Sequence, residues 1–180
     1  MEEDATGVAQ SEWSQLFKEL RKRTIEPLQS VSFVVYAIVG TAILGGLGIW
    51  VEVTKIILAD GAIDLTNLLT AMTTFFMALV GTAAYQMNFA AVERKDKPMI
   101  AFAWIMFFIF FIAAIFLSLF GTRQTAYCIV AGVFSSVGAI WFWWITNGGD
   151  RLWQKIEPDA PAGGALDRNI RGDLEGFTVK

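Results

Sequence analysis

Apolar residues along this chain gather in four long stretches that contain no Asp, Glu, Lys or Arg. The stretches cover residues 27–51, 65–92, 98–122 and 124–149, and have 25, 28, 25 and 26 residues. A helix needs about 20 apolar residues to cross a bilayer core of roughly 30 Å. The pattern therefore predicts an all-α, polytopic membrane protein with four transmembrane helices, at about 28–51, 65–91, 98–121 and 125–147.

The basic residues predict the orientation of these spans. Of the 14 Lys and Arg residues, 12 lie before the first span, between the second and third, or after the fourth. Only Lys55 and Arg123 lie in the other two connections. Because basic residues near span ends are kept on the cytoplasmic side, we expect a multi-pass protein of the cell membrane with both termini in the cytoplasm. The predicted organisation is an N-terminal cytoplasmic segment (1–26), a transmembrane domain (27–149) and a cytoplasmic tail (150–180) that is largely disordered alone.

An amphipathic helix is predicted ahead of the first span. Trp13, Leu16, Phe17 and Leu20 recur at helical spacing, opposite a basic face. This pattern is typical of a helix that lies in the membrane interface, and a solvated helix packed on a partner domain is the alternative. The candidate contacts with lipid or with a cytoplasmic protein partner are Trp13, Phe17, Arg21, Arg23, Arg94, Lys95, Lys97 and Trp153.

The second span carries small and polar residues on one stripe. Alternating steps of four and three residues from Asn67 reach Ala71, Thr74, Ala78, Gly81, Tyr85 and Asn88. The opposite side carries Leu68, Leu69, Met72, Phe75, Phe76, Leu79 and Val80. We expect lipid against this second set, and protein or water along the stripe. Helix packing is the ordinary interpretation of the stripe, and a polar pathway lined by Asn67, Thr74, Tyr85 and Asn88 is the alternative.

Small residues in the other spans also predict close helix contacts, because they let two backbones approach each other in lipid. The predicted helix-packing residues are Ala37, Thr41, Gly45, Ala78, Gly81, Gly132 and Ser135. A hinge at Gly45, Gly46 and Gly48 is an alternative for the first span. Near the end of the fourth span, the aromatic run 141–144 predicts half of an interfacial aromatic belt.

Side chains that usually carry chemistry are scarce. The chain has no histidine and one cysteine, Cys128, and no Asp, Glu, Lys or Arg lies inside a span. Haem and zinc sites usually need histidine or several cysteines, nucleophilic catalysis needs a base, and a proton-coupled exporter generally needs a carboxylate in the membrane. We therefore expect no enzyme activity and no metal or cofactor. We also expect no direct nucleic-acid binding, because the basic residues are spread over separate segments.

Two classes of function remain open from these patterns. In the first, the protein is a homo-oligomeric sensor or anchor that holds a cytoplasmic protein partner at the membrane. In the second, several copies surround a pore that is lined by the polar stripe of the second span, since a single four-helix bundle is too narrow to enclose an aqueous channel.

Two short segments carry a resemblance to a known group. WVEVTK at 50–55 and TFFMALVGT at 74–82, together with the four-span layout, resemble the small four-span membrane subunit of Kiwa-type bacterial anti-phage defence systems. The resemblance covers residues 28 to 147 and leaves the tail outside. It implies a bacterial inner-membrane oligomer that senses infection at the envelope and works with a cytoplasmic DNA-binding partner. It assigns no functional residue.

Overall fold

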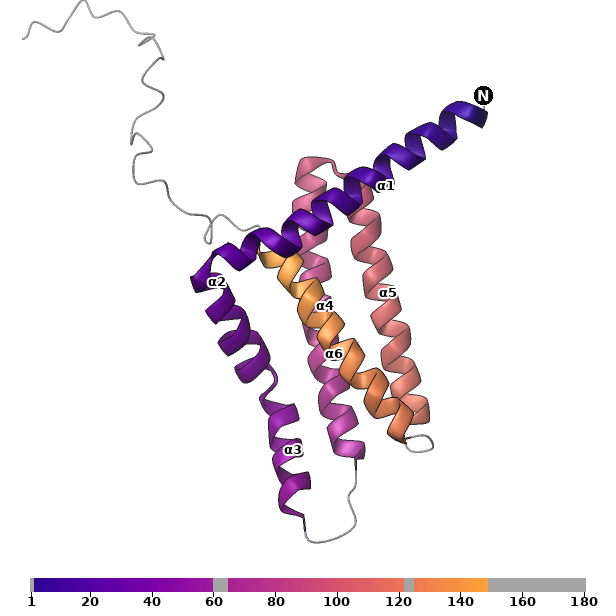
Figure 1. Ribbon diagram of the computed structural model, residues 1–180. Helices are drawn as coiled ribbons and strands as arrows, with labels where there is room; N and C mark the ends of the chain where they lie inside the picture. The colour runs from indigo at the N-terminus through magenta and orange to yellow at the C-terminus, as the bar shows by residue number, and fades with distance from the viewer. Residues whose placement is uncertain (1, 60–64, 122–124, 149–180) are drawn as a thin grey trace, which may run out of the picture.

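The computed structural model describes residues 2–59, 65–121 and 125–148, and these are helical, with no strand among them (Figure 1). In chain order the elements are α1 (Glu2–Ile25), η1 (Glu26–Gln29), α2 (Val31–Tyr36), η2 (Ala37–Gly45), α3 (Leu47–Leu58), α4 (Thr66–Arg94), α5 (Lys97–Phe120) and α6 (Thr125–Asn147). The segment η1 is a 3-10 turn and η2 is π-helical. The all-α, polytopic fold is confirmed. The predicted tail, with Trp153, lies outside the described residues.

Three helices match predicted spans closely. Helices α4, α5 and α6 are each long and apolar enough to cross a bilayer. A tight connection joins α4 to α5: Lys95 adopts a left-handed conformation (φ 56°), and the Asp96 carboxylate caps α5 by accepting a 3.2 Å hydrogen bond from the Met99 backbone N–H. These two residues reverse the chain within one turn, so α4 and α5 form an antiparallel pair.

The first predicted span differs most from the structure. The range 28–51 is not one helix, because it holds the end of η1, all of α2 and η2, and the first residues of α3. The chain bends by 95° at the start of this range, between α1–η1 and α2–η2. Buried Pro27 lies in the first turn of η1, at this corner. The Ser30 hydroxyl oxygen caps α2 by accepting a hydrogen bond from the Phe33 backbone N–H. The number of spans is three, or four if this bent pair is counted as one.

A second break separates η2 from α3. Gly46 has φ −82° and ψ 8°, outside the helical region, and a Cβ atom there would overlap the Ala42 carbonyl oxygen. That oxygen instead accepts a 3.1 Å hydrogen bond from the indole N–H of Trp50. Trp50 thus satisfies a backbone acceptor next to the break, which lipid could not do.

The core lies where α4 packs on α5 and α6. The buried residues of α4 are Leu68, Leu69, Met72, Phe76, Val80, Ala83, Ala84, Met87 and Ala91. The expectation that the large apolar side of this helix faces lipid is therefore wrong. Acyl chains are as apolar as leucine, so the side that packs is selected by shape and not by polarity. The bulky side of α4 fills the space between α5 and α6.

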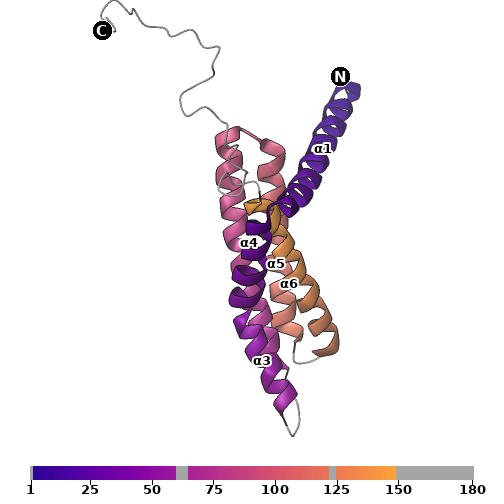
Figure 2. The ribbon, with the colours of Figure 1, turned by 60° about the vertical axis from the view of Figure 1, so that its left-hand side comes forward.

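Helix α1 crosses the bundle obliquely, beside the last turns of α6 and the first turns of α5 (Figures 1 and 2). Leu16 and Leu20 are buried on its inner side. The Trp144 indole N–H donates a 3.2 Å hydrogen bond to the Thr24 carbonyl. Residues 13–25 thus form a helix with a packed apolar side, as the spacing predicts, and the helix begins much earlier, at Glu2.

The aromatic run 141–144 of α6 packs mainly inside the chain and does not form the predicted interfacial belt. Phe142 and Trp143 are buried, and only Trp141 in this run is exposed. The Phe33 ring stacks on Trp143 at 5.9 Å and meets Trp144 edge-on at 4.7 Å between centroids. These contacts join the corner between α1 and α2 to the end of α6, because Phe33 follows the bend directly.

Candidate functional site

The small and polar stripe of the second span lies on the outer side of α4 in the single chain. We call this surface the α4 face; it consists of Asn67, Ala71, Thr74, Ala78, Gly81, Tyr85 and Asn88. Asn67, Thr74, Ala78 and Tyr85 are exposed, the last to 73%. A Cβ atom at Gly81 would meet no atom within 4 Å. The described helices of one chain therefore leave most of this surface uncovered, while Ala71 and Asn88 are half-buried.

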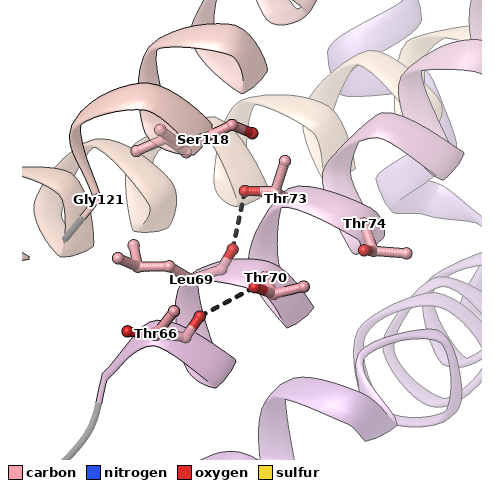
Figure 3. Close-up of a pocket in the computed structure, with 8 residues that line it drawn as sticks. Thr66, Leu69, Thr70, Thr73, Thr74, Ser118 and Gly121 are labelled. Atoms are coloured by element: carbon pink, nitrogen blue, oxygen red, sulfur yellow. Dashed lines mark hydrogen bonds between the residues drawn. The ribbon is translucent and has the colours of Figure 1, made fainter.

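A groove borders the α4 face on the α5 side (Figure 3). It has a volume of about 270 Å³ and is lined by Thr66, Leu69, Thr70, Thr73, Thr74, Leu117, Ser118 and Gly121. The hydroxyls of Thr70 and Thr73 donate to the carbonyls four residues earlier, at 3.0 and 2.8 Å. Such bonds let hydroxyls lie in an apolar environment, while their oxygens keep a free acceptor site.

A wider groove, of about 550 Å³, borders the α4 face on the other side. Its lining residues are Gly45, Gly48, Ile49, Ala71, Thr74, Phe75, Ala78, Leu79 and Thr82. Here α3 approaches α4 closely, because a Cβ atom at Gly48 would lie 3.9 Å from that of Ala71. Thr74 lines both grooves and donates to no other described residue. Its hydroxyl is therefore available to a partner from outside the chain.

Asn88, at one end of the α4 face, carries an unsatisfied acceptor. Its side-chain N–H donates to the Ala84 carbonyl at 2.9 Å, but its buried Oδ1 has no hydrogen-bond partner in the part of the chain that the structure describes. A buried acceptor without a partner costs about 1–3 kcal/mol. A water molecule or a donor from another chain would remove that cost.

The predicted packing residues fall into two groups. Ala37, Thr41 and Gly132 are buried inside the chain. Gly45 and Ala78 are exposed, and Gly81 and Ser135 are half-buried.

On α6 the buried hydroxyl belongs to Ser136, one residue beyond the predicted Ser135, and donates to the Gly132 carbonyl at 2.8 Å. A Cβ atom at Gly132 would lie 3.0 Å from the Met72 sulfur, so this glycine permits the close approach of α4 and α6. Spacing alone could not separate Ser135 from Ser136, because both follow the same run of small residues.

The predicted partner or lipid contacts gather at the end of the molecule where α1 lies, in so far as the structure describes them. Trp13 and Phe17 are exposed on α1, with ring centroids 6.4 Å apart. Arg21 is also exposed, while Arg23 is half-buried and pairs with Glu19 at 2.8 Å. Arg94, Lys95 and Lys97 are exposed around the connection from α4 to α5.

Among the described residues, no three His, Cys, Asp or Glu side chains gather to hold a metal ion. Cys128 is buried. No known protein family matches the chain, and no curated protein and no solved structure is significantly similar to it.

Proposed function

We propose that this protein is a non-enzymatic integral membrane subunit that associates with copies of itself through the α4 face and acts as a membrane sensor or anchor for a cytoplasmic protein partner. The observation that carries this proposal is the exposure of small and polar side chains along α4. The bulky side of the same helix is already used inside the chain.

Exposure of this surface to acyl chains is unfavourable for two reasons. The Thr74 hydroxyl and the Asn67 amide donate to no other described residue, and hydrocarbon offers no hydrogen-bond partner. Ala78 and Gly81 leave little side-chain bulk, so lipid gains few contacts there while a second helix could approach closely. The two grooves beside the α4 face would receive the larger side chains of the neighbouring copy. Each interhelical polar contact adds about 0.6 kcal/mol on average.

Cysteine cross-linking in membranes tests this association. The single native cysteine would be replaced (Cys128→Ala), and Ala78→Cys would place a thiol at the centre of the α4 face. We expect a disulfide-linked dimer after mild oxidation. The matched control is Ile112→Cys, because Ile112 is 64% exposed on the outer side of α5. Absence of the dimer with Ala78→Cys, or equal cross-linking at both positions, would overturn the proposal.

The partner-binding part of the proposal rests on the end of the molecule where α1 lies and where Arg21, Arg94, Lys95 and Lys97 are exposed. The surface formed by α1 and the connection from α4 to α5 offers exposed aromatic and basic side chains outside the spans. The Kiwa resemblance adds the expectation that this role belongs to anti-phage defence, with a DNA-binding protein as the partner. Purification in mild detergent, with identification of co-purifying proteins and a mass measurement, tests this. A monomer without a companion would contradict it.

An oligomeric pore is the second candidate, because the α4 face that would line it carries Asn67 and Thr74 uncovered. Ion flux into liposomes reconstituted with the unmodified protein separates the two functions. A sensor or anchor should leave the liposomes sealed. A pore should conduct, and Thr74→Val, which removes the hydroxyl and keeps the size of the side chain, should lower the flux while the copies still cross-link at Ala78→Cys.

A further inference from the structure

An apolar groove of about 240 Å³ lies between α1 and the first turns of α5. Its lining residues are Trp13, Leu16, Pro98, Ala101, Phe102 and Ile105. Its lining residues from α5 belong to the first turns of that helix, so the groove lies toward the end of the transmembrane helices and not at their centre. Helix α1 crosses the bundle at this same end (Figure 1). The lining of the groove therefore meets the bilayer near the level of the lipid head groups.

Some basic side chains of the described residues form ion pairs with acidic side chains, and others do not. Lys22 and Arg23 form ion pairs with Glu26 and Glu19 along α1, at 3.7 and 2.8 Å. Lys55, at the opposite end of the molecule, pairs with Glu52 at 2.6 Å.

The basic side chains that form no ion pair within the described residues are Lys18, Arg21, Arg94, Lys95 and Lys97. All five lie at the end that holds the groove, and Lys97 directly precedes the lining residue Pro98. The acids near α5 do not balance them: Asp96 is engaged as the helix cap, and Glu93 is one carboxylate among three cations. Lys97 therefore places an exposed positive charge, without an ion pair in the described residues, at the α5 edge of the groove.

We propose that this groove binds an anionic phospholipid, with one acyl chain between α1 and α5 and the phosphate beside Lys97. The apolar lining suits the chain, and the unpaired cations suit the head group. The indole N–H of Trp13 donates to no other described residue, and the ring is 56% exposed, so it can donate to a phosphate or ester oxygen. The ligand thus contacts α1 and α5 together and would strengthen their association.

The size of the groove favours a lipid chain over a protein segment. A helix with its side chains is about 10–12 Å wide, and a pocket for a drug-sized molecule has about 300–1,000 Å³. A slot of about 240 Å³ between two helices is too small for a helix and suits one section of a thin, flexible chain. No lining residue belongs to α4, so this inference does not rest on the proposed self-association.

Lipid binding to the delipidated full-length protein in uncharged detergent tests the proposal. The probes are dioleoyl phosphatidylglycerol, dioleoyl phosphatidylcholine and inorganic phosphate, and the readout is bound lipid in native mass spectrometry. We expect phosphatidylglycerol to bind, phosphatidylcholine to bind at least tenfold more weakly, and inorganic phosphate not to compete. Competition by inorganic phosphate, or equal binding of both lipids, would overturn the proposal.

Two variants locate the site. Ala101→Trp fills the groove from an exposed position and should weaken phosphatidylglycerol binding at least tenfold, whereas Ile112→Trp, elsewhere on the outer side of α5, should not. Lys97→Gln should weaken binding about fivefold, as expected for one surface cation near a lipid phosphate, while Lys55→Gln should have no effect. Lys97→Gln alters no packed side chain, so it decides the test if Ala101→Trp does not fold. Equal effects of a variant and its control would overturn the proposal.

Discussion

Truncation of Phe76 tests which side of α4 faces the protein. Its ring is fully buried, 6.1 Å from that of Phe110 on α5. In water-soluble cores Phe→Ala costs about 3–5 kcal/mol, of which removal of the ring from water supplies about 1.5–3 kcal/mol. The contribution from removal of the ring from water is absent in lipid, because acyl chains are as apolar as the core. Phe76→Ala should therefore lower the free energy of unfolding by roughly 2 kcal/mol, the packing part alone.

Reversible unfolding in mixed micelles, followed by far-UV circular dichroism during titration with SDS, measures this loss. A change of about 2 kcal/mol lowers the ratio of folded to unfolded protein about 30-fold. The matched control is Phe89→Ala, on the exposed side of the same helix; it should change the free energy of unfolding by less than about 0.5 kcal/mol. A larger loss for Phe89→Ala than for Phe76→Ala would refute the orientation of α4.

Two further predictions follow from the helix contacts. Gly132→Leu should lower the free energy of unfolding by about 1–3 kcal/mol, because it overpacks the contact of α6 with α4. Gly81→Leu should leave the free energy of unfolding unchanged and abolish cross-linking at the α4 face. The same SDS titration measures the free energy of unfolding of both variants, and equal destabilisation would contradict the assignment of Gly132 to the inside and Gly81 to the outside of the chain. Trp144→Phe removes the hydrogen bond to the Thr24 carbonyl, so it should cost about 0.5–1.5 kcal/mol and speed amide hydrogen exchange in α1. The control Trp141→Phe should leave that exchange unchanged. Slow exchange in both variants would show that the hydrogen bond from Trp144 to Thr24 does not stabilise α1 against the end of α6.

The positions of the long helices could be predicted from the sequence because charge is excluded from the bilayer core. Helices α4 and α5 begin and end within three residues of the predicted spans 65–91 and 98–121. The charged connection between them contains Asp96, and a carboxylate at this place is a good helix cap. These signals are local in the sequence, so no knowledge of neighbouring helices is needed to read them.

Which side of each helix packs could not be predicted in the same way. Phe110 and Phe108 are two residues apart in the same apolar span, yet their exposed fractions are 6% and 54%. Lipid and protein interior have nearly the same polarity, so the sequence carries little contrast between the two environments. The α4 face illustrates the consequence: its stripe was recognisable, but the single chain packs the opposite side.

The break at Gly46 was only partly recognisable. The glycines at 45, 46 and 48 indicated a flexible place, and a hinge was one interpretation of them. The Trp50 indole donates to the carbonyl of Ala42, which lies in the π-helical segment η2. Such a contact joins residues eight positions apart and has no signature in hydropathy.

The loose attachment of α3 has a consequence for the order of assembly. No residue of α3 is buried, whereas α4 buries nine. During synthesis α3 leaves the ribosome before α4, on which it packs, has been made. We therefore expect α3 to dock onto α4 only after the hairpin of α4 and α5 has closed, and to be the first element to separate from the others on heating.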